Sequence, residues 1–312
     1  MGHAYGHVIQ TPQLTGLTAQ QGAGMAELED WTCTYNGLVM GVPDSAISIV
    51  QVDGLLTLPE VRSSDLTLLQ RHGLFAGDDY MNGRTVTLTL EVYGSTREEF
   101  TQALNDVQAA FIPGGIEAPF SFKFPGVAAD RSAYFLARPR KRSAPLDLNF
   151  AYGVCNVVVE LYATSPYMLG SDTRESVVKS FARTDTPKGL TVPYEVPFTV
   201  QSNGAPPADP VTWLTQWGSI PARPFITVTD GASPVLWDDT TGQRFAVSYD
   251  GTFTIDSANE RVTTAQGDVI NGLIAEGSVW PEYGPGTHRL RLTSRDEYTA
   301  ARAVLSWVDR WV

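Results

Sequence analysis

The sequence has only two cysteines, Cys33 and Cys155, in a chain of 312 residues. Two cysteines are too few for a disulfide-stapled scaffold or for a cysteine-rich zinc site. Both stand among apolar or hydroxyl residues in stretches that favour strands, so we expect buried free thiols. A bond between the two is the alternative, although domains of this size do not need one to be stable.

Histidines and catalytic motifs are also scarce. The four histidines are His3, His7, His72 and His288, and no two are spaced to share a metal ion from one helix. The sequence contains no HExxH, no GxSxG, no P-loop and no dinucleotide fingerprint. We therefore predict that the protein is not an enzyme and that it has no cofactor and no metal site.

Long apolar runs are missing, and positive charge is in deficit. No stretch of about 18 apolar residues occurs, and the first residues lack the basic and apolar regions of a signal peptide. We expect neither a signal peptide nor a membrane anchor. The 22 Lys and Arg residues stand against 34 Asp and Glu residues, for a net charge of −12. This acidity argues against a general nucleic-acid grip, which needs a basic surface.

What the sequence does contain is strand-like alternation interrupted by one helix. In residues 85–92 every second side chain is aliphatic, namely Val86, Leu88, Leu90 and Val92. This period of two predicts a half-buried strand. Helical spacing then follows at Phe100, Leu104, Val107 and Phe111, which predicts a helix packed on the sheet. Ser95 and Glu98 predict a capping box at its start, and Pro113 ends it.

Residues 62–83 form a half-apolar stretch broken by glycines, and it predicts a long ordered loop. Its leucines and phenylalanine are too apolar for a free loop, so we expect them to bury against a neighbouring subunit, with exposed charges at the rim. The predicted interface residues are Leu66, Leu68, Leu69, Arg71, Leu74, Phe75, Asp78 and Asp79. A basic run, Arg138, Arg140, Lys141 and Arg142, is too short for a nucleic-acid tract and predicts a basic strand face that pairs with acidic residues of a neighbour.

The composition changes after residue 168. Eight prolines lie between 184 and 224, and six of the seven tryptophans lie beyond 165. Short strands separated by turn residues follow, which is the pattern of a β-sandwich. We expect a first domain over 1–168 with a flexible arm at 1–26, a linker at 169–192 and a sandwich at 193–312. The end of the chain favours a strand, with a helix capped by Ser294 and Glu297 as the alternative.

Several segments in order resemble a known family. They are "GLFAGDDYMNGRTVTLTLEV", the single capped helix, "VVVELYATSPYML", and in the second domain "GSIPARPFITVTDG", "TTGQRFAV", "TFTIDSANERVT" and "SVWPEYGPGTHRLRL", with "WVDRWV" at the end. Together they resemble the distal tail proteins, or minor tail proteins, of long-tailed siphophages, particularly those of actinobacterial hosts. The resemblance extends from about residue 31 to the end.

The resemblance implies a mainly β, two-domain fold. The first domain would be a sandwich or split barrel similar to tail-tube subunits, with one flanking helix, and the second a galectin-like β-sandwich. Six copies would form a ring in the virion tail that joins the tail tube protein to the tail-tip hub, with the tape measure protein as a further partner. The genomic DNA would pass through the lumen.

The alternative function is a carbohydrate-binding or host-receptor-binding module in the second domain. Galectin-type sites use a His-x-Asn-Arg strand and a Trp-Gly-x-x-Glu loop. Here His288 is followed by Arg-Leu-Arg, and Trp280 by Pro-Glu-Tyr, so neither motif matches. We therefore expect His288 and Trp280 to be structural residues, and the family's fold does not by itself transfer a sugar site.

Overall fold

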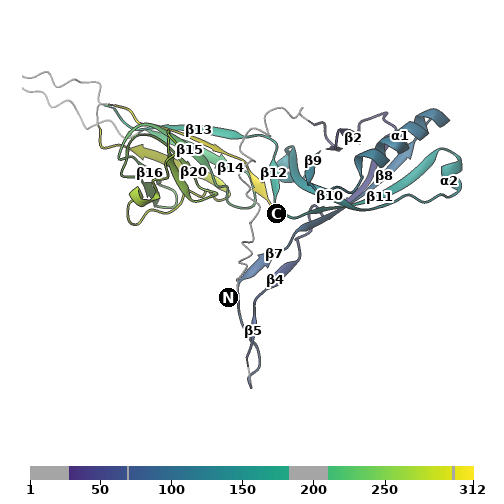
Figure 1. The fold of residues 1–312 in the computed structure, drawn as a ribbon, viewed down its shortest axis with the longest axis horizontal. Coiled ribbons are helices and arrows are strands. Elements are labelled where there is room, and N and C mark those ends of the chain that lie inside the picture. The colour runs from purple at the N-terminus through teal and green to yellow at the C-terminus, as the bar shows by residue number, and fades with distance from the viewer. Residues whose placement is uncertain (1–27, 69, 183–209, 297–298) are drawn as a thin grey trace, which may run out of the picture.

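The computed structural model describes residues 28–68, 70–182, 210–296 and 299–312. The described chain forms two β-domains side by side, and a narrow two-stranded arm projects between them (Figure 1). The N-terminal segment 1–26, which we expected to be flexible, lies outside the described residues. The prediction of a mainly β chain with two domains and one packed helix is confirmed, with a further one-turn helix, α2, that the sequence pattern did not predict.

The first domain is built on one strongly coiled sheet in the order β2-β1-β9-β10-β11-β8-β3. Its strands are β1 (Thr32–Tyr35), β2 (Leu38–Met40), β3 (Ile47–Asp53), β8 (Arg84–Tyr93), β9 (Ala118–Lys123), β10 (Ala133–Ser143), β11 (Val154–Ala163) and β12 (Met168–Gly170). Its helices are α1 (Arg97–Ala110), the 3-10 turn η1 (Ala128–Asp130) and α2 (Leu148–Ala151). All pairings in the sheet are antiparallel, and β12 attaches to it through β10.

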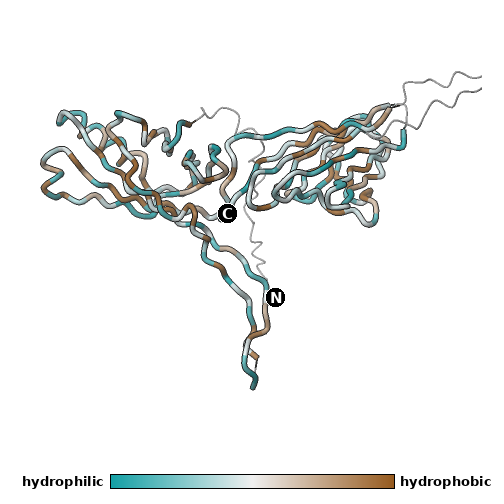
Figure 2. The backbone as a smooth tube through the Cα atoms, turned by 180° about the vertical axis from the view of Figure 1, so that it is seen from behind, coloured by the Kyte–Doolittle hydropathy of each residue, from teal (hydrophilic) through white to brown (hydrophobic). Residues whose placement is uncertain are grey.

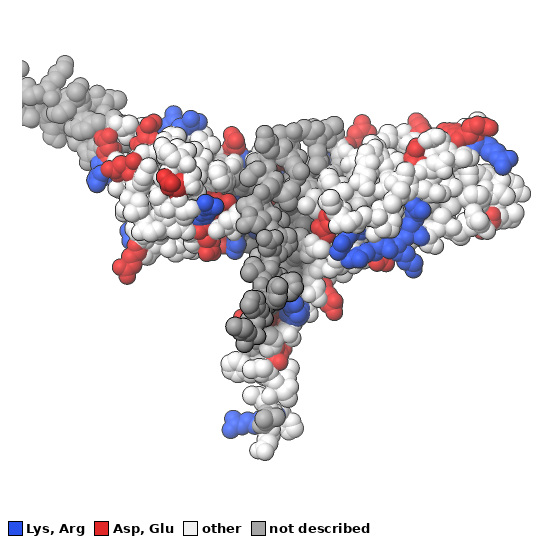
Figure 3. Space-filling model, viewed as in Figure 1, with Lys and Arg blue, Asp and Glu red and all other residues white. Residues whose placement is uncertain are grey.

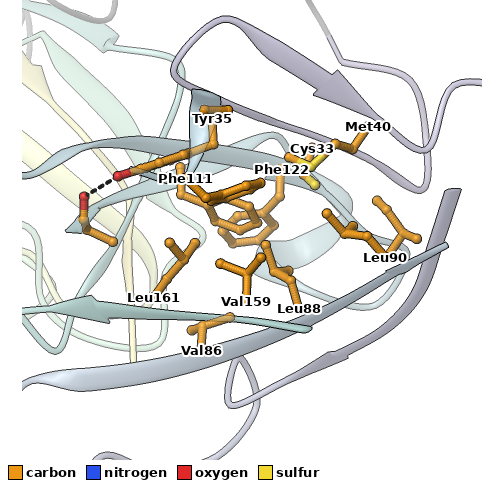
Figure 4. Packing of buried hydrophobic residues seen from close by; sticks show 14 of the residues in the cluster. Cys33, Tyr35, Met40, Val86, Leu88, Leu90, Phe111, Phe122, Val159 and Leu161 are labelled. Carbon is orange, nitrogen blue, oxygen red and sulfur yellow. Dashed lines mark hydrogen bonds between the residues drawn. The ribbon is translucent and has the colours of Figure 1, made fainter. Parts of the chain in front are cut away.

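The core of this domain lies between the two halves of the coiled sheet and α1. The predicted apolar face of β8 is confirmed, since its four aliphatic side chains have no exposed surface. Phe111 stacks on Tyr35 with ring centroids 5.2 Å apart, and the Tyr35 hydroxyl donates to the carbonyl of Ala137 at 3.0 Å (Figure 4). Burial raises the pKa of Tyr35 above its ordinary value, so the phenol stays a donor. Cys33 and Cys155 are buried and free, as expected.

Helix α1 begins one residue later than the sequence predicted. Thr96 is the N-cap, and its side chain accepts from the backbone N–H of Glu99 at 3.1 Å. The Glu99 carboxylate accepts from the backbone and hydroxyl of Ser95. The predicted pair of Ser95 and Glu98 is therefore wrong by one position, because two adjacent hydroxyl residues precede two adjacent glutamates and either pair has capping-box spacing.

The predicted loop at 62–83 is instead a β-hairpin. Strand β4 (Val61–Ser63) pairs with β7 (Asp79–Met81), and β5 (Leu66–Thr67) pairs with β6 (Leu74–Phe75). The glycines that argued against a continuous strand divide the hairpin into two short ladders and do not prevent pairing. We call residues 61–81 the arm.

The second domain is a sandwich of two sheets, in the orders β13-β21-β15-β18-β19 and β14-β20-β16-β17. Its strands are β13 (Arg174–Lys179), β14 (Val211–Gln216), β15 (Phe225–Ala232), β16 (Val235–Asp238), β17 (Gln243–Ala246), β18 (Asp250–Asp256), β19 (Arg261–Thr264), β20 (Gly286–Thr293) and β21 (Arg302–Trp307), with the 3-10 turn η2 (Asn271–Leu273). Buried side chains from both sheets, such as Ile226 and Leu290, form one core. Trp280 packs partly buried on its edge, as expected.

A buried pair of hydrogen-bonded side chains, His288 and Asp238, lies inside this sandwich. His288 Nδ1 lies 2.8 Å from the carboxylate of Asp238, and its Nε2 lies 2.9 Å from the carbonyl of Gly284. The same carboxylate accepts from Thr240 and Thr241 in the following turn. His288 is thus a structural residue whose two ring nitrogens both have partners, and it ties the β16–β17 turn to β20.

The domain boundary differs from the predicted one. β12 and β13 lie within or at the edge of the stretch 169–192 that we expected to be a linker, and the rest of that stretch beyond 182 lies outside the described residues. The prolines that suggested a linker begin only at 187, whereas Val178 fills the sandwich core.

The chain end is extended, as favoured, and β22 (Arg310–Trp311) returns to pair with β12, which places Trp311 in the core of the first domain.

Asp309 holds the C-terminal segment in place through contacts with both domains. Its buried carboxylate accepts from the Trp217 backbone and the Trp307 indole, both at 3.3 Å, and pairs with Arg174 at 3.3 Å. Its carbonyl accepts from the N–H of Gly170 in the first domain at 3.0 Å. One residue therefore joins the last strands of both domains.

We expect Phe111, the C-cap of α1, and Leu104, within α1, to differ in how much they stabilise the first domain. Phe111→Ala should lower the free energy of unfolding by about 3–5 kcal/mol, because the ring is fully buried. Leu104→Ala should cost clearly less, because Leu104 is only half-buried. Urea unfolding followed by circular dichroism measures both, and equal losses would contradict this packing.

Asp309→Ala should destabilise the protein by roughly 2–4 kcal/mol, because the Trp217 backbone N–H and the buried Trp307 indole N–H would lose their acceptor and Arg174 would lose its ion-pair partner. The control is Glu282→Ala, which removes the exposed partner of Arg223 at 3.7 Å and should change stability by less than about 1 kcal/mol. Thermal and urea unfolding compare the two. Similar small effects would show that Asp309 does not fasten the domains.

Candidate subunit interface on the arm

The root of the arm is fixed by Arg84, the first residue of β8. Its guanidinium is buried and donates to the carbonyls of Pro166 at 3.1 Å, Gly54 at 2.9 Å and Leu55 at 2.5 Å. Burial lowers the pKa of this guanidinium, but arginine titrates so far above neutral pH that it stays charged. Arg84, at the start of β8, therefore connects the segment that follows β3 with the segment that follows β11. These contacts hold both ends of the chain that forms the arm.

Backbone contacts keep the arm narrow along its length. Asp78 accepts from the backbone and hydroxyl of Ser64 at 3.3 and 3.0 Å, and the Asp65 carboxylate accepts from the N–H of Gly77 at 2.9 Å. A side chain at Gly77 would meet the Ser64 carbonyl at 2.4 Å, so only glycine allows the two strands to come this close. The arm is an ordered hairpin rather than an open loop.

The arm exposes most of its apolar side chains. The exposed fractions are 65% for Leu66, 59% for Leu74 and 64% for Phe75. Leu68 is exposed as well, and Leu69 lies outside the described residues. Hydrophobic segments are visible along the arm in Figure 2, and its visible surface in Figure 3 carries few charges. Contiguous exposed apolar surface of this kind is typical of a binding interface.

The charged residues predicted for the rim, Arg71, Asp78 and Asp79, are all exposed on the arm. Sequence reasoning missed further apolar residues on and beside it: Leu56, Leu58, Val61 and Tyr80 are also exposed. Tyr80 lies under the guanidinium of Arg62, 6.0 Å from the ring centroid. Recognising 61–63 and 79–81 as the paired strands of a hairpin would have revealed Val61 and Tyr80.

The predicted basic face divides between two sides of β10. Arg138 and Lys141 lie opposite Tyr162 and Glu160, on the outer side of the sheet, and Arg140 stacks on the Tyr162 ring at 5.0 Å. Arg142 lies opposite the buried Val159 and donates to the carbonyl of Gln108 in α1 at 2.6 Å. The cause is a β-bulge between Pro139 and Lys141, which shifts the alternation by one residue.

The outer-side residues still form one basic surface. Lys and Arg side chains gather in a band along the lower edge of the first domain in Figure 3.

Within the described residues, no group of three or more His, Cys, Asp or Glu side chains is arranged to hold a metal ion. The described helices are also too short or too polar to span a membrane.

The comparison with solved structures concerns the fold as a whole. The crystal structure of the Dit protein (gp 19.1) of phage SPP1, described as a paradigm of the hub adsorption apparatus in phages that infect Gram-positive bacteria, matches with a TM-score of 0.56 at 16% identity. The match covers 90% of this chain and 99% of the SPP1 protein. This chain has the Dit fold.

Two structures of the phage P2 baseplate in its activated conformation, with Ca and with Sr, match with TM-scores of 0.39 and 0.37 at 10% identity. They cover 88% of this chain and 97% and 96% of the baseplate chains, but the scores are too low to carry an argument. No family model and no curated protein matches the sequence. The Dit fold is thus established from three-dimensional structure, with both domains included.

Replacing Arg84 with Leu should loosen the arm at its root. The carbonyls of Gly54, Leu55 and Pro166 would lose their donor, and each such buried group costs about 1–3 kcal/mol when left unpaired. We expect a lower unfolding temperature and faster proteolysis within 55–83. Arg62→Leu, a change on the exposed arm itself, is the control. An Arg84→Leu protein with unchanged stability and proteolysis would contradict the anchoring role.

Proposed function

We propose that this protein is a structural, non-catalytic subunit of the distal end of a long, non-contractile phage tail. Six copies form a ring that joins the tail tube to the tail-tip hub, and DNA passes through the ring during infection. The observation that carries the proposal is the Dit fold over 90% of this chain, combined with an ordered arm that exposes apolar side chains.

The arm supports ring formation on physical grounds. Full burial of a leucine or phenylalanine side chain contributes roughly 1.5–3 kcal/mol, so Leu66, Leu74 and Phe75 together offer a substantial contact. Because the arm is a hydrogen-bonded hairpin, less conformational freedom is lost on binding than for a free loop. An arm that projects from one subunit onto a different surface of the next makes a heterologous contact, and such contacts close into rings when the rotation permits.

Charge supports the assembly in a second way. Arg138, Arg140 and Lys141 lie on the outer side of the first domain's sheet, in a chain whose net charge is −12. In a ring this basic surface would pair with acidic residues of an adjacent copy, while acidic residues on the lumen wall would keep DNA from adhering. Such charge pairs add specificity more than affinity.

The proposed partners follow from this place in the virion tail. They are other copies of the chain, the tail tube protein, the tail-tip hub protein and the tape measure protein. Genomic DNA is only a transient contact of the lumen. In this proposal the first domain is tail-tube-like and forms the ring, whereas the galectin-like second domain projects from it.

Replacing Leu74 and Phe75 together with serine should weaken the ring without unfolding the subunit, because both side chains are exposed in the isolated chain. Native mass spectrometry and light scattering measure the assembly, and circular dichroism checks the fold. The matched control replaces Val269 and Leu273, exposed apolar residues of the second domain, with serine.

The expected result is loss of hexamers in the arm variant and their retention in the control. A wild-type chain that is monomeric at all concentrations, alone and with its tail partners, would refute the ring. Rings that persist unchanged in the arm variant would refute the role of the arm only. Unfolding of the arm variant would mean that the arm packs within its own subunit.

A further inference from the structure

The outer face of the four-stranded sheet in the second domain carries an ordered array of tryptophan and arginine. Strand register places Trp213 on β14 opposite Arg289 on β20. It also places Arg291, two residues further along β20, opposite Trp237 on β16. Trp237 in turn lies opposite Arg244 on β17. Because directly opposed side chains share one face of a sheet, all five lie on the outer side, and the alternating residues of β20 are buried.

The charged groups of this array are held in place by each other. The guanidinium groups of Arg244 and Arg291 lie 5.7 and 5.3 Å from the centre of the Trp237 ring, one from each neighbouring strand. Asp239 pairs with Arg291 at 3.1 Å and lies 3.8 Å from Arg289. This face thus presents three arginines and one carboxylate among its described residues, in a chain with a net charge of −12.

Trp213 is the exposed member of the array. Its side chain is 62% exposed, and the Arg289 side chain beside it is 49% exposed. Nearby, the hydroxyls of Thr215 and Thr287 lie 3.2 Å apart on the same face. The face therefore offers an open indole ring, a neighbouring cation and small hydroxyl groups within a few strand spacings of about 4.8 Å.

This composition distinguishes between possible ligands. The core of a protein–protein interface is depleted of aspartate, glutamate and lysine, whereas here the Asp239 carboxylate lies between Arg289 and Arg291. A sugar chain needs a different surface, in which an aromatic ring stacks on the apolar face of a pyranose and flanking groups bind hydroxyls. The exposed guanidinium fork of Arg289 selects carboxylate or phosphate groups on that chain.

We propose that this face binds an anionic polysaccharide, with a sugar ring stacked on Trp213 and an acidic group on Arg289. The Asp239 carboxylate orients Arg289 and Arg291 and accepts from sugar hydroxyls. This site differs in strand motif from the galectin-type pattern and does not depend on ring formation, so either proposal can fail without the other.

Isothermal titration calorimetry on the full chain tests the site with short polygalacturonate oligomers as the probe. Neutral dextran oligomers test whether sugar rings without charge are bound. Polyglutamate of similar length tests whether carboxylates without sugar rings are bound. We expect polygalacturonate to bind at least about tenfold more tightly than either, with an affinity that falls as salt is added. Trp213→Ala and Arg289→Ala should each weaken binding by at least about tenfold.

The matched control is Phe225→Ala, which removes an exposed aromatic ring from the outer face of the other sheet and should leave the affinity unchanged. Because Trp213 and Arg289 are exposed, unfolding temperatures of the variants should stay close to that of the parent. Absence of polygalacturonate binding overturns the proposal, and so does equal binding of polyglutamate, which would indicate a site for acidic protein segments. Unchanged affinity in Trp213→Ala overturns it as well.

Discussion

Strand β10 is the element on which the rest of the structure depends. β9, β11 and β12 all pair with it, and β12 pairs in turn with β22 at the end of the chain. The bulge after Pro139 lets the strand bend, so that the two halves of the sheet face each other and enclose one core. Without that bend the phenylalanines of β9 and the aliphatic face of β8 could not meet around α1.

The same architecture explains how an apolar arm can project from the first domain. Arg84 uses three backbone carbonyls to hold the arm root where β8 begins, so the arm leaves the sheet from a rigid base. Its own backbone groups are paired along the hairpin, and the exposed surface is that of side chains. An element of this kind reaches a partner without having to fold at that moment, which lowers the entropic cost of assembly.

The second domain combines a tight connection on one side with an open surface on the other. Asp309 and β22 tie it to the first domain through buried hydrogen bonds, whereas the four-stranded sheet carries its arginines and tryptophans outward. A fold of this type does not dictate one ligand, because the residues on the outer face of a sheet are free to vary while the inner face keeps the core. The proposed ring contact on the arm and the proposed binding site on the outer sheet face therefore lie on separate elements of the chain.

The sequence by itself determined the mainly β class, the buried face of β8 and the position of the helix to within one residue, and it favoured free cysteines and a structural role for His288. These depend on local periodicity and composition, which a single sequence displays. The tertiary structure alone decided that 62–83 is a hairpin, that Arg142 leaves the basic face, that 174–179 is a sandwich strand and that Trp311 belongs to the first core. Each of these depends on pairing between segments far apart in the chain, and strand register, bulges and partners are set by contacts that no local pattern contains.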